Sequence, residues 1–395
     1  MNEKHTVSTT EVEEWFEEEA SDNPISGSTV LLDPAEKYAR SQLRVVRETK
    51  DYQLDYLRHA LEPDRELIDT APGYQRRLRW TNKKRSLLIE SFLLNIPVPP
   101  IFLFEHNYNE YEVIDGRQRL ETIRAFLANN FALTGLEYWP ELERKRYNDL
   151  PSVLQKGLLR RSLSAVVLLA ETRGVDADEL DVRRVLFDRL NTGGIRLNPQ
   201  ELRNALYPGR LNALLIRLAR SEPFTTTWGV PAFVEGETEE PSEALLKNPL
   251  FSSLADAELV LRFFALRDAI TNRRTGSLRR ILDRYMDERK NITQIEEEEM
   301  GAMYLTLLSR LVKLFDGEPF RLPKTKRPSR PVYDAFMIAL SQSAQLDLEA
   351  KSISVREALA VALQDDTSYD VLVGRGNTIE SIRQRVDLAS QILNA

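Results

Sequence analysis

The sequence of 395 residues contains no cysteine, and this absence removes several classes of protein from consideration. Disulfide frameworks, cysteine-ligated zinc sites, iron–sulfur clusters and thiol nucleophiles all require cysteine. Histidine is almost as scarce, because the three histidines, His5, His59 and His106, all precede residue 107. The C-terminal half therefore cannot supply a histidine ligand, and an HNH-type nuclease site in that half is excluded. Metal sites built from carboxylates alone remain open.

Long apolar runs are also missing. The most apolar stretch, residues 87–104, contains Glu90, Asn95 and three prolines, so it is unsuited to a transmembrane helix. Met1 is followed by an acidic segment rather than by a basic region and an apolar run, so we expect no signal peptide. Together with the lack of cysteine, these features lead us to expect a cytoplasmic protein that does not bind membranes.

The formal net charge of −7 is concentrated at the N-terminus. Residues 1–36 hold ten acidic side chains and a single basic one, while the rest of the chain is close to neutral. Such a segment is typical of a disordered tail or a solvated arm. An alternative is that it mimics a nucleic acid and covers a basic groove.

Hydrophobic periodicity predicts an α+β chain. Strand-length apolar runs occur at 101–104, 111–114 and 163–170, and the last of them is predicted to be a strand buried on both faces. Helical patterns occur at 52–61, 82–95, 117–129, 178–190 and 199–206. After about residue 210 the patterns are nearly all helical, and residues 222–250 are rich in Pro, Glu and Gly. We therefore predict an acidic tail over 1–36, an α+β domain over 37–221, a connection over 222–250 and a mostly helical domain over 251–395.

One segment between a predicted strand and a predicted helix carries residues suited to anion binding. Asp115 and Gly116 end the strand, and Arg117, Gln118 and Arg119 begin the helix. The free N–H groups at a helix start bind anions, and planar guanidinium groups fit phosphate oxygens. The carboxylate of Asp115 is suited to holding a divalent cation or orienting a water. The same residues could instead form only a structural Asp–Arg pair at a capped helix.

Two further clusters are open to a functional or a plainer interpretation. Residues 73–85 hold six basic side chains and no acidic one, and the aromatic rings of Tyr74 and Trp80 between them could stack on bases. The plainer interpretation is an exposed basic loop with Trp80 in the core. Residues 187–194 end in Gly193 and Gly194, which permit a nest of backbone N–H groups or simply a helix C-cap.

Taken together, the three clusters resemble the N-terminal domain family of GmrSD-type restriction endonucleases, whose members carry a DGQQR motif. Four blocks match in order: GYQR with a tryptophan over 73–80, LIES and NIPVP over 88–99, DGRQRL over 115–120, and RLNTGG with a following ELRN over 189–204. They span about residues 40–210. The resemblance implies that the α+β domain is similar to the ParB/sulfiredoxin nucleotide-binding fold.

The resemblance also implies a site for a nucleoside triphosphate, ATP or GTP, with Mg²⁺. Asp115, Gln118 and Arg119 would line the phosphate and metal site as catalytic residues, with Asp115 as the metal ligand. The residues implied to contact the nucleotide are Tyr74, Gln75, Arg76, Gly116, Arg117 and Asn191. Arg117 departs from the family, which usually has Gln at that position, and this change could preserve phosphate binding while altering hydrolysis.

The nuclease module of the family has no counterpart in the C-terminal half. We therefore expect an NTP-hydrolysing component of a bacterial restriction or antiphage defence system that works with a separate nuclease or effector chain. The alternatives are a DNA-binding recognition or regulatory module that uses nucleotide as a switch or not at all, and a degenerate interaction protein. Basic stretches at 273–290 and 321–330 are suited to DNA contact, or are solvated faces.

Overall fold

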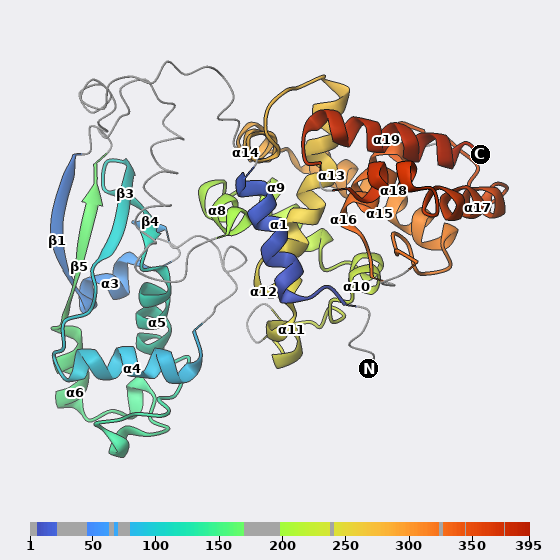
Figure 1. Cartoon of the computed structure of the whole chain (residues 1–395). Helices are drawn as coiled ribbons and strands as arrows, with labels where there is room; N and C mark the ends of the chain where they lie inside the picture. Colours follow the sequence, from blue (N-terminus) through green and yellow to red (C-terminus); the bar gives the residue numbers. More distant parts are fainter. Residues whose placement is uncertain are drawn as a thin grey trace. The chain divides into compact units, whose positions relative to one another are not determined.

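The computed structural model describes residues 6–21, 46–62, 67–69, 80–169, 198–237, 241–323, 327–343, 345–374 and 376–395. The chain forms two compact units, and each is described by itself (Figure 1). The mixed unit lies within residues 29–197 and contains a sheet with helices. The helical unit contains the N-terminal helix and the chain from residue 198 onward. The predicted α+β class is confirmed, whereas the likeness to the ParB/sulfiredoxin fold stays a prediction.

The mixed unit is built on a five-stranded sheet with the order β1-β5-β3-β4-β2. Its strands are β1 (Arg47–Gln53), β2 (Ile68–Asp69), β3 (Ile101–Asn107), β4 (Glu110–Asp115) and β5 (Ser162–Leu168). β1 with β5 and β3 with β4 are antiparallel, while β3 with β5 and β2 with β4 are parallel. The short loop after β3 makes a hairpin with β4, so the end of β4 lies beside the start of β3.

Helices pack against this sheet and build the core of the mixed unit. They are α3 (Leu54–Ala60), α4 (Asn82–Leu93), α5 (Arg117–Leu127) and α6 (Ser152–Leu159), joined by the short 3₁₀ turns η2 (Pro140–Leu142) and η3 (Tyr147–Asp149). In β5 the alternate residues Leu163, Ala165 and Val167 are fully buried, whereas Ser164 and Val166 between them are only partly buried. The expectation of a strand buried on both faces is therefore wrong for β5, whose side chains alternate as in a one-sided sheet.

The helical unit contains the remaining elements. They are α1 (Thr9–Ser21), α8 (Pro199–Leu206), α9 (Arg210–Leu218), α10 (Glu222–Trp228), α11 (Glu243–Lys247), α12 (Pro249–Ser252), α13 (Ala255–Thr271), α14 (Leu278–Arg289), α15 (Gln294–Leu314), α16 (Arg330–Gln342), α17 (Ser352–Ala362), α18 (Asp366–Val373) and α19 (Ile379–Leu393). In Figure 1, α13 and α16 lie among the other helices of this unit. Both are buried on nearly every side, as expected for helices at the centre of a core.

The acidic N-terminal segment departs from the predicted tail, because residues 9–21 form helix α1. Its apolar residues Val12 and Phe16 are buried, and so is the carboxylate of Glu19. Glu11 forms an ion pair with Arg327 at 2.7 Å, Glu18 pairs with Arg330 at 2.8 Å, and Glu19 pairs with Arg203. Disorder was expected from charge alone, but the helix has a buried apolar stripe and basic partners that are distant in sequence.

The boundary between the units also differs from the expected one. The sequence predicts a connection over 222–250, whereas the compact helical unit already begins at residue 198. The described part of this stretch contains α10, α11 and α12, whose large apolar residues are buried except for Leu246 of α11. Trp228, for example, is 1% exposed and lies edge-on to Tyr333 at 5.5 Å between ring centroids.

No helix in the described ranges is long and apolar enough to cross a membrane.

Candidate functional site

The turn from β4 to α5 holds the most specific group of predicted site residues. Gly116 caps the start of α5 with φ of +93°, a left-handed conformation that L side chains rarely adopt. A Cβ atom added to Gly116 would lie 2.2 Å from Cγ2 and 2.8 Å from Cβ of Ile101. Glycine is therefore required here for two reasons, the backbone conformation and the close approach of β3.

Asp115 and Arg119 flank this glycine and are joined directly. Nη2 of Arg119 donates to Oδ2 of Asp115 at 2.7 Å, and Nη1 donates to the carbonyl oxygen of Pro99 at 2.7 Å. The side chain of Asp115 keeps 29% of its surface exposed and that of Arg119 keeps 12%. The structural Asp–Arg pair that the sequence left open is therefore present, and it presents a carboxylate and a fixed guanidinium to solvent.

The first turn of α5 carries no acidic side chain to compensate the positive end of the helix. The helix has no side-chain cap and no acidic residue in its first turn, so its first N–H groups lack the capping acceptor that a Ser or Asp supplies. The guanidinium of Arg117 lies along the helix instead, where Nε donates to Oε1 of Glu121 at 2.6 Å. These features make the turn a place where an anion would be stabilised.

Gln118 contributes an unusual polar atom to the same turn. Its Oε1 is buried and accepts no hydrogen bond from the described residues. A buried acceptor without a donor costs free energy, on the order of 1–3 kcal/mol. Gln118 is therefore suited to receiving a donor from a bound molecule.

A metal site is only partly prepared. In the described ranges, no group of three or more Asp, Glu or His side chains is arranged to hold a metal ion. Asp115 is the carboxylate at the turn, and its Oδ1 has no hydrogen bond from any described residue. A single carboxylate together with phosphate oxygens and waters is a common environment for Mg²⁺, so the residue present fits that ion when a nucleotide is bound.

The structure brings together Asp115, Gly116, Arg117, Gln118 and Arg119, which are consecutive at the turn. The other predicted contacts, Tyr74, Gln75, Arg76 and Asn191, lie outside the described residues. Trp80 follows the plainer interpretation, since it is partly buried against the core of the mixed unit, with Nζ of Lys84 at 4.7 Å from its ring centroid.

Sequence reasoning missed two supports of the site. The carbonyl of Pro99 accepts a hydrogen bond from Arg119, and the side chain of Ile101 leaves no room for a Cβ atom at position 116. Neither residue was singled out from the sequence. A signal did exist for Pro99, which ends the NIPVP block and is separated from Ile101 by one residue. Sequence alone did not show that this block meets the DGRQR block.

One of the comparisons with known proteins gives a match. Residues 59–208 match the model of the family described as GmrSD restriction endonuclease, N-terminal domain. Residues 59–208, the GmrSD segment, are similar to that family. No curated protein and no solved structure matches the chain. The GmrSD segment includes the β4–α5 turn, and it extends through α8, which belongs to the helical unit.

The last motif of the GmrSD segment has a structural role in that helix. Asn198 and Glu201 form a capping box at the start of α8, with Glu201 N donating to Oδ1 of Asn198 at 2.9 Å. Arg203 is 1% exposed and is surrounded by carboxylates. The amide oxygen of Asn204 accepts a hydrogen bond from Asn212 at 2.8 Å. The described part of this block therefore builds the start of the helical unit.

Proposed function

We propose that this chain is the nucleotide-binding component of a bacterial restriction or antiphage defence system, and that it hydrolyses a nucleoside triphosphate at the β4–α5 turn. The observation that carries the proposal is the Asp115–Gly116–Arg119 arrangement, at a helix start without a side-chain cap inside the GmrSD segment. Because no histidine follows His106 in this sequence, DNA cleavage by an HNH site is assigned to a part of the system outside these 395 residues.

The residues of the turn suit phosphoryl transfer, in which positioning and charge stabilisation provide most of the catalysis. A phosphate at the start of α5 would meet the helix N–H groups and the guanidinium of Arg119. Asp115 and Pro99 hold that guanidinium in place before a ligand arrives, so little reorganisation is needed. Mg²⁺, held by Asp115 and the phosphates, would neutralise charge on the phosphate oxygens.

The test is phosphate release from ATP, GTP, CTP and UTP with Mg²⁺, with and without duplex DNA. Asp115→Ala and Arg119→Ala should each lower kcat strongly, since loss of one preorganised charged group costs on the order of 2–4 kcal/mol in the transition state. Arg124→Ala is the matched control, because this arginine is exposed in the last turn of the same helix. Thermal unfolding of each variant separates lost catalysis from lost folding.

Turnover that persists in folded Asp115→Ala and Arg119→Ala would refute a catalytic role for the turn. Failure of all four nucleotides to be hydrolysed by the wild type would refute the proposed NTPase activity. Equilibrium binding of the same nucleotides would then identify a binding switch.

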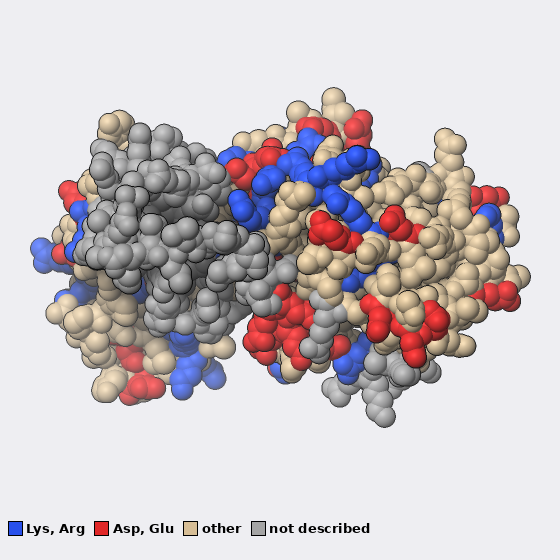
Figure 2. Space-filling view, turned by 45° about the horizontal axis from the view of Figure 1, so that its top comes forward, with Lys and Arg blue, Asp and Glu red and all other residues tan. Residues whose placement is uncertain are grey.

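A second candidate function, DNA recognition, is favoured by one observation in the helical unit. Arg273, Arg280 and Arg284 are exposed and form no ion pair with the described residues, while neighbouring Arg274, Arg289 and Lys290 are paired with carboxylates. Figure 2 shows a continuous area of Lys and Arg side chains on this unit. Such a patch is the electrostatic footprint expected of a phosphate-binding face.

Titration with duplex DNA at several salt concentrations tests this candidate. Binding should weaken as salt rises, survive Asp115→Ala, and fall at least tenfold in the double variant Arg280→Glu and Arg284→Glu. Arg289→Glu is the control, since that arginine is already paired with Glu296 at 3.0 Å. Equal DNA affinity in the double variant and the wild type would rule out this face.

A further inference from the structure

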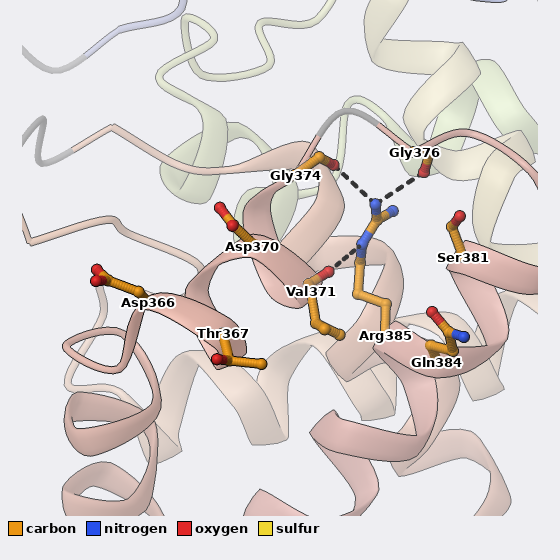
Figure 3. A pocket seen from close by; sticks show the side chains of 9 residues that line it. All are labelled: Asp366, Thr367, Asp370, Val371, Gly374, Gly376, Ser381, Gln384 and Arg385. Carbon is orange, nitrogen blue, oxygen red and sulfur yellow. Dashed lines mark hydrogen bonds between the residues drawn. The ribbon is translucent and has the colours of Figure 1, made fainter.

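A cavity of about 470 Å³ opens between α18 and α19 in the helical unit. Figure 3 shows its lining side chains, with α18 supplying one wall and α19 the other. Arg385 extends from α19 and its guanidinium lies beside Gly374 and Gly376. Asp366, Thr367 and Asp370 are on the α18 side, and Ser381 and Gln384 are on the α19 side.

Arg385 is the central chemical feature of this cavity. Its side chain belongs to a residue that is only 2% exposed. Nε donates to the carbonyl of Val371 at 3.1 Å, and Nη2 donates to the carbonyls of Gly374 and Gly376 at 2.9 Å each. No carboxylate of the described residues lies within ion-pair distance of it, and burial lowers the pKa of its guanidinium. Arg385 is thus a buried charge whose hydrogen bonds within the described residues all go to backbone carbonyls, while the more distant carboxylates of Asp334 and Glu18 favour its charged form.

These hydrogen bonds have a structural explanation, but it is incomplete. Val371 and Gly374 lie at the C-terminal end of α18, where a cation stabilises the orphan carbonyls and the negative end of the helix. Capping accounts for Nε and Nη2. It does not account for Nη1, which is buried and has no hydrogen-bond partner in the described part of the chain. Buried donors in folded proteins are nearly always paired, so this nitrogen calls for a partner.

The surroundings of Nη1 indicate the kind of partner. In Figure 3 the unpaired nitrogen is on the side of the guanidinium that faces Ser381. Ser381 belongs to the first turn of α19, a helix of 15 residues whose N-cap Thr378 accepts a hydrogen bond from Ser381 N at 3.2 Å. A guanidinium nitrogen and the positive end of a helix both favour a negatively charged oxygen.

We propose that this cavity binds an oxyanion, the carboxylate or phosphate group of a small molecule, with Nη1 of Arg385 as its anchor. Asp366 and Asp370 are exposed on the opposite wall. Their charges disfavour ligands with several negative charges, such as a nucleoside triphosphate, and favour a ligand that also carries an ammonium or another donor. The site is therefore separate in chemistry from the β4–α5 turn and does not depend on nucleotide binding there.

The experiment is calorimetric titration of the full chain with sodium acetate, sodium phosphate and glycine at constant ionic strength, with sodium chloride as the baseline. Saturable binding of at least one probe is expected. Acetate and glycine would identify a carboxylate ligand, and phosphate alone would identify a phosphate ligand. Affinity should fall at least tenfold in Arg385→Met and should stay unchanged in Arg383→Met, which changes a neighbouring arginine bonded to the carbonyl of Arg274.

Because Arg385 also caps α18, its replacement could prevent folding, so a second variant fills the cavity. Thr367→Trp places an indole on the exposed α18 wall and leaves every hydrogen bond of Arg385 in place. Binding should also fall at least tenfold in this variant. Unchanged affinity in folded Thr367→Trp, or no saturable binding of any probe to the wild type, would overturn the proposal.

Discussion

The buried carboxylate of Glu19 offers a sharp test of the helical unit, because α1 depends on it. Glu19 is 1% exposed and forms an ion pair with Nη2 of Arg203, while its other oxygen lies 3.3 Å from Nη1. Arg203 also contacts Asp283 at 2.8 Å and Glu258 at 3.4 Å. Replacing Glu19 by Gln keeps its volume and removes its charge, so the variant isolates the ion pair.

The size of the effect follows from what remains around Arg203. Removing one partner of a buried ion pair costs about 3–5 kcal/mol when the other charge is left uncompensated. Here Arg203 keeps Asp283. In addition, burial and the nearby charge of Glu19 raise the pKa of Glu258 to about 7, and without Glu19 that carboxyl ionises more readily. We therefore expect a loss at the lower end, about 3 kcal/mol. For a unit of about this size that loss lowers Tm by about 6–12 °C.

Thermal unfolding followed by circular dichroism measures this loss. Glu17→Gln is the matched control, since Glu17 is an exposed acidic residue of the same helix and its change should alter stability by less than about 0.5 kcal/mol. Equal Tm values for the two variants would show that the Glu19–Arg203 pair adds nothing. A higher Tm in Glu19→Gln would show that burying this charge costs more than its pairing returns, and either result would refute the reasoning.

Two further predictions concern the mixed unit and the pH dependence of the helical unit. Gly116→Ala should lower the free energy of unfolding by about 2–4 kcal/mol, because position 116 has a positive φ and an added Cβ would overlap with Ile101. The control is Gly157→Ala on α6, where the added methyl group meets open space and should raise the free energy of unfolding by about 0.5–1 kcal/mol. Urea unfolding measures both changes. Because the pKa of Glu258 is about 7 in the folded chain against 4.5 in the reference state, the folded state binds the extra proton and its stability should fall as pH rises from about 5 to 7. Glu258→Gln should flatten that part of the Tm–pH curve, and an unchanged slope would contradict the assignment.

Local signals in the sequence were sufficient for the β4–α5 turn and for most helices. A polar residue and a glycine after an apolar strand run predict the turn, and α5 begins at Arg117 as expected. Pro199 at a helix start likewise predicted α8. Helix α4 begins at Asn82 as expected, and its cap is Thr81, which accepts from Lys84 N. In these cases the information lies within a few residues.

Other elements depend on partners that are far away in the sequence. β1 covers residues 47–53, RETKDYQ, a polar segment without the pattern of a strand. Its pairing with β5 supplies the backbone hydrogen bonds that local propensity does not predict. Helix α1 is similar, because the buried state of Glu19 requires Arg203, which is 184 positions away. The apolar spacing of Val12 and Phe16 was the available signal.

Charge compensation separates the arginines of this chain by role. Arg203 is fully buried against three carboxylates, so an added anion would only raise the repulsion around it, and its role is structural. Arg119 has one carboxylate and one carbonyl, and that carboxylate is open to solvent, so a phosphate with a cation would complete its surroundings. Among the residues that the structure describes, Arg385 donates hydrogen bonds to carbonyls only, and its Nη1 has no partner. Anion binding should therefore be absent at Arg203, should depend on a divalent cation at Arg119, and should proceed without one at Arg385.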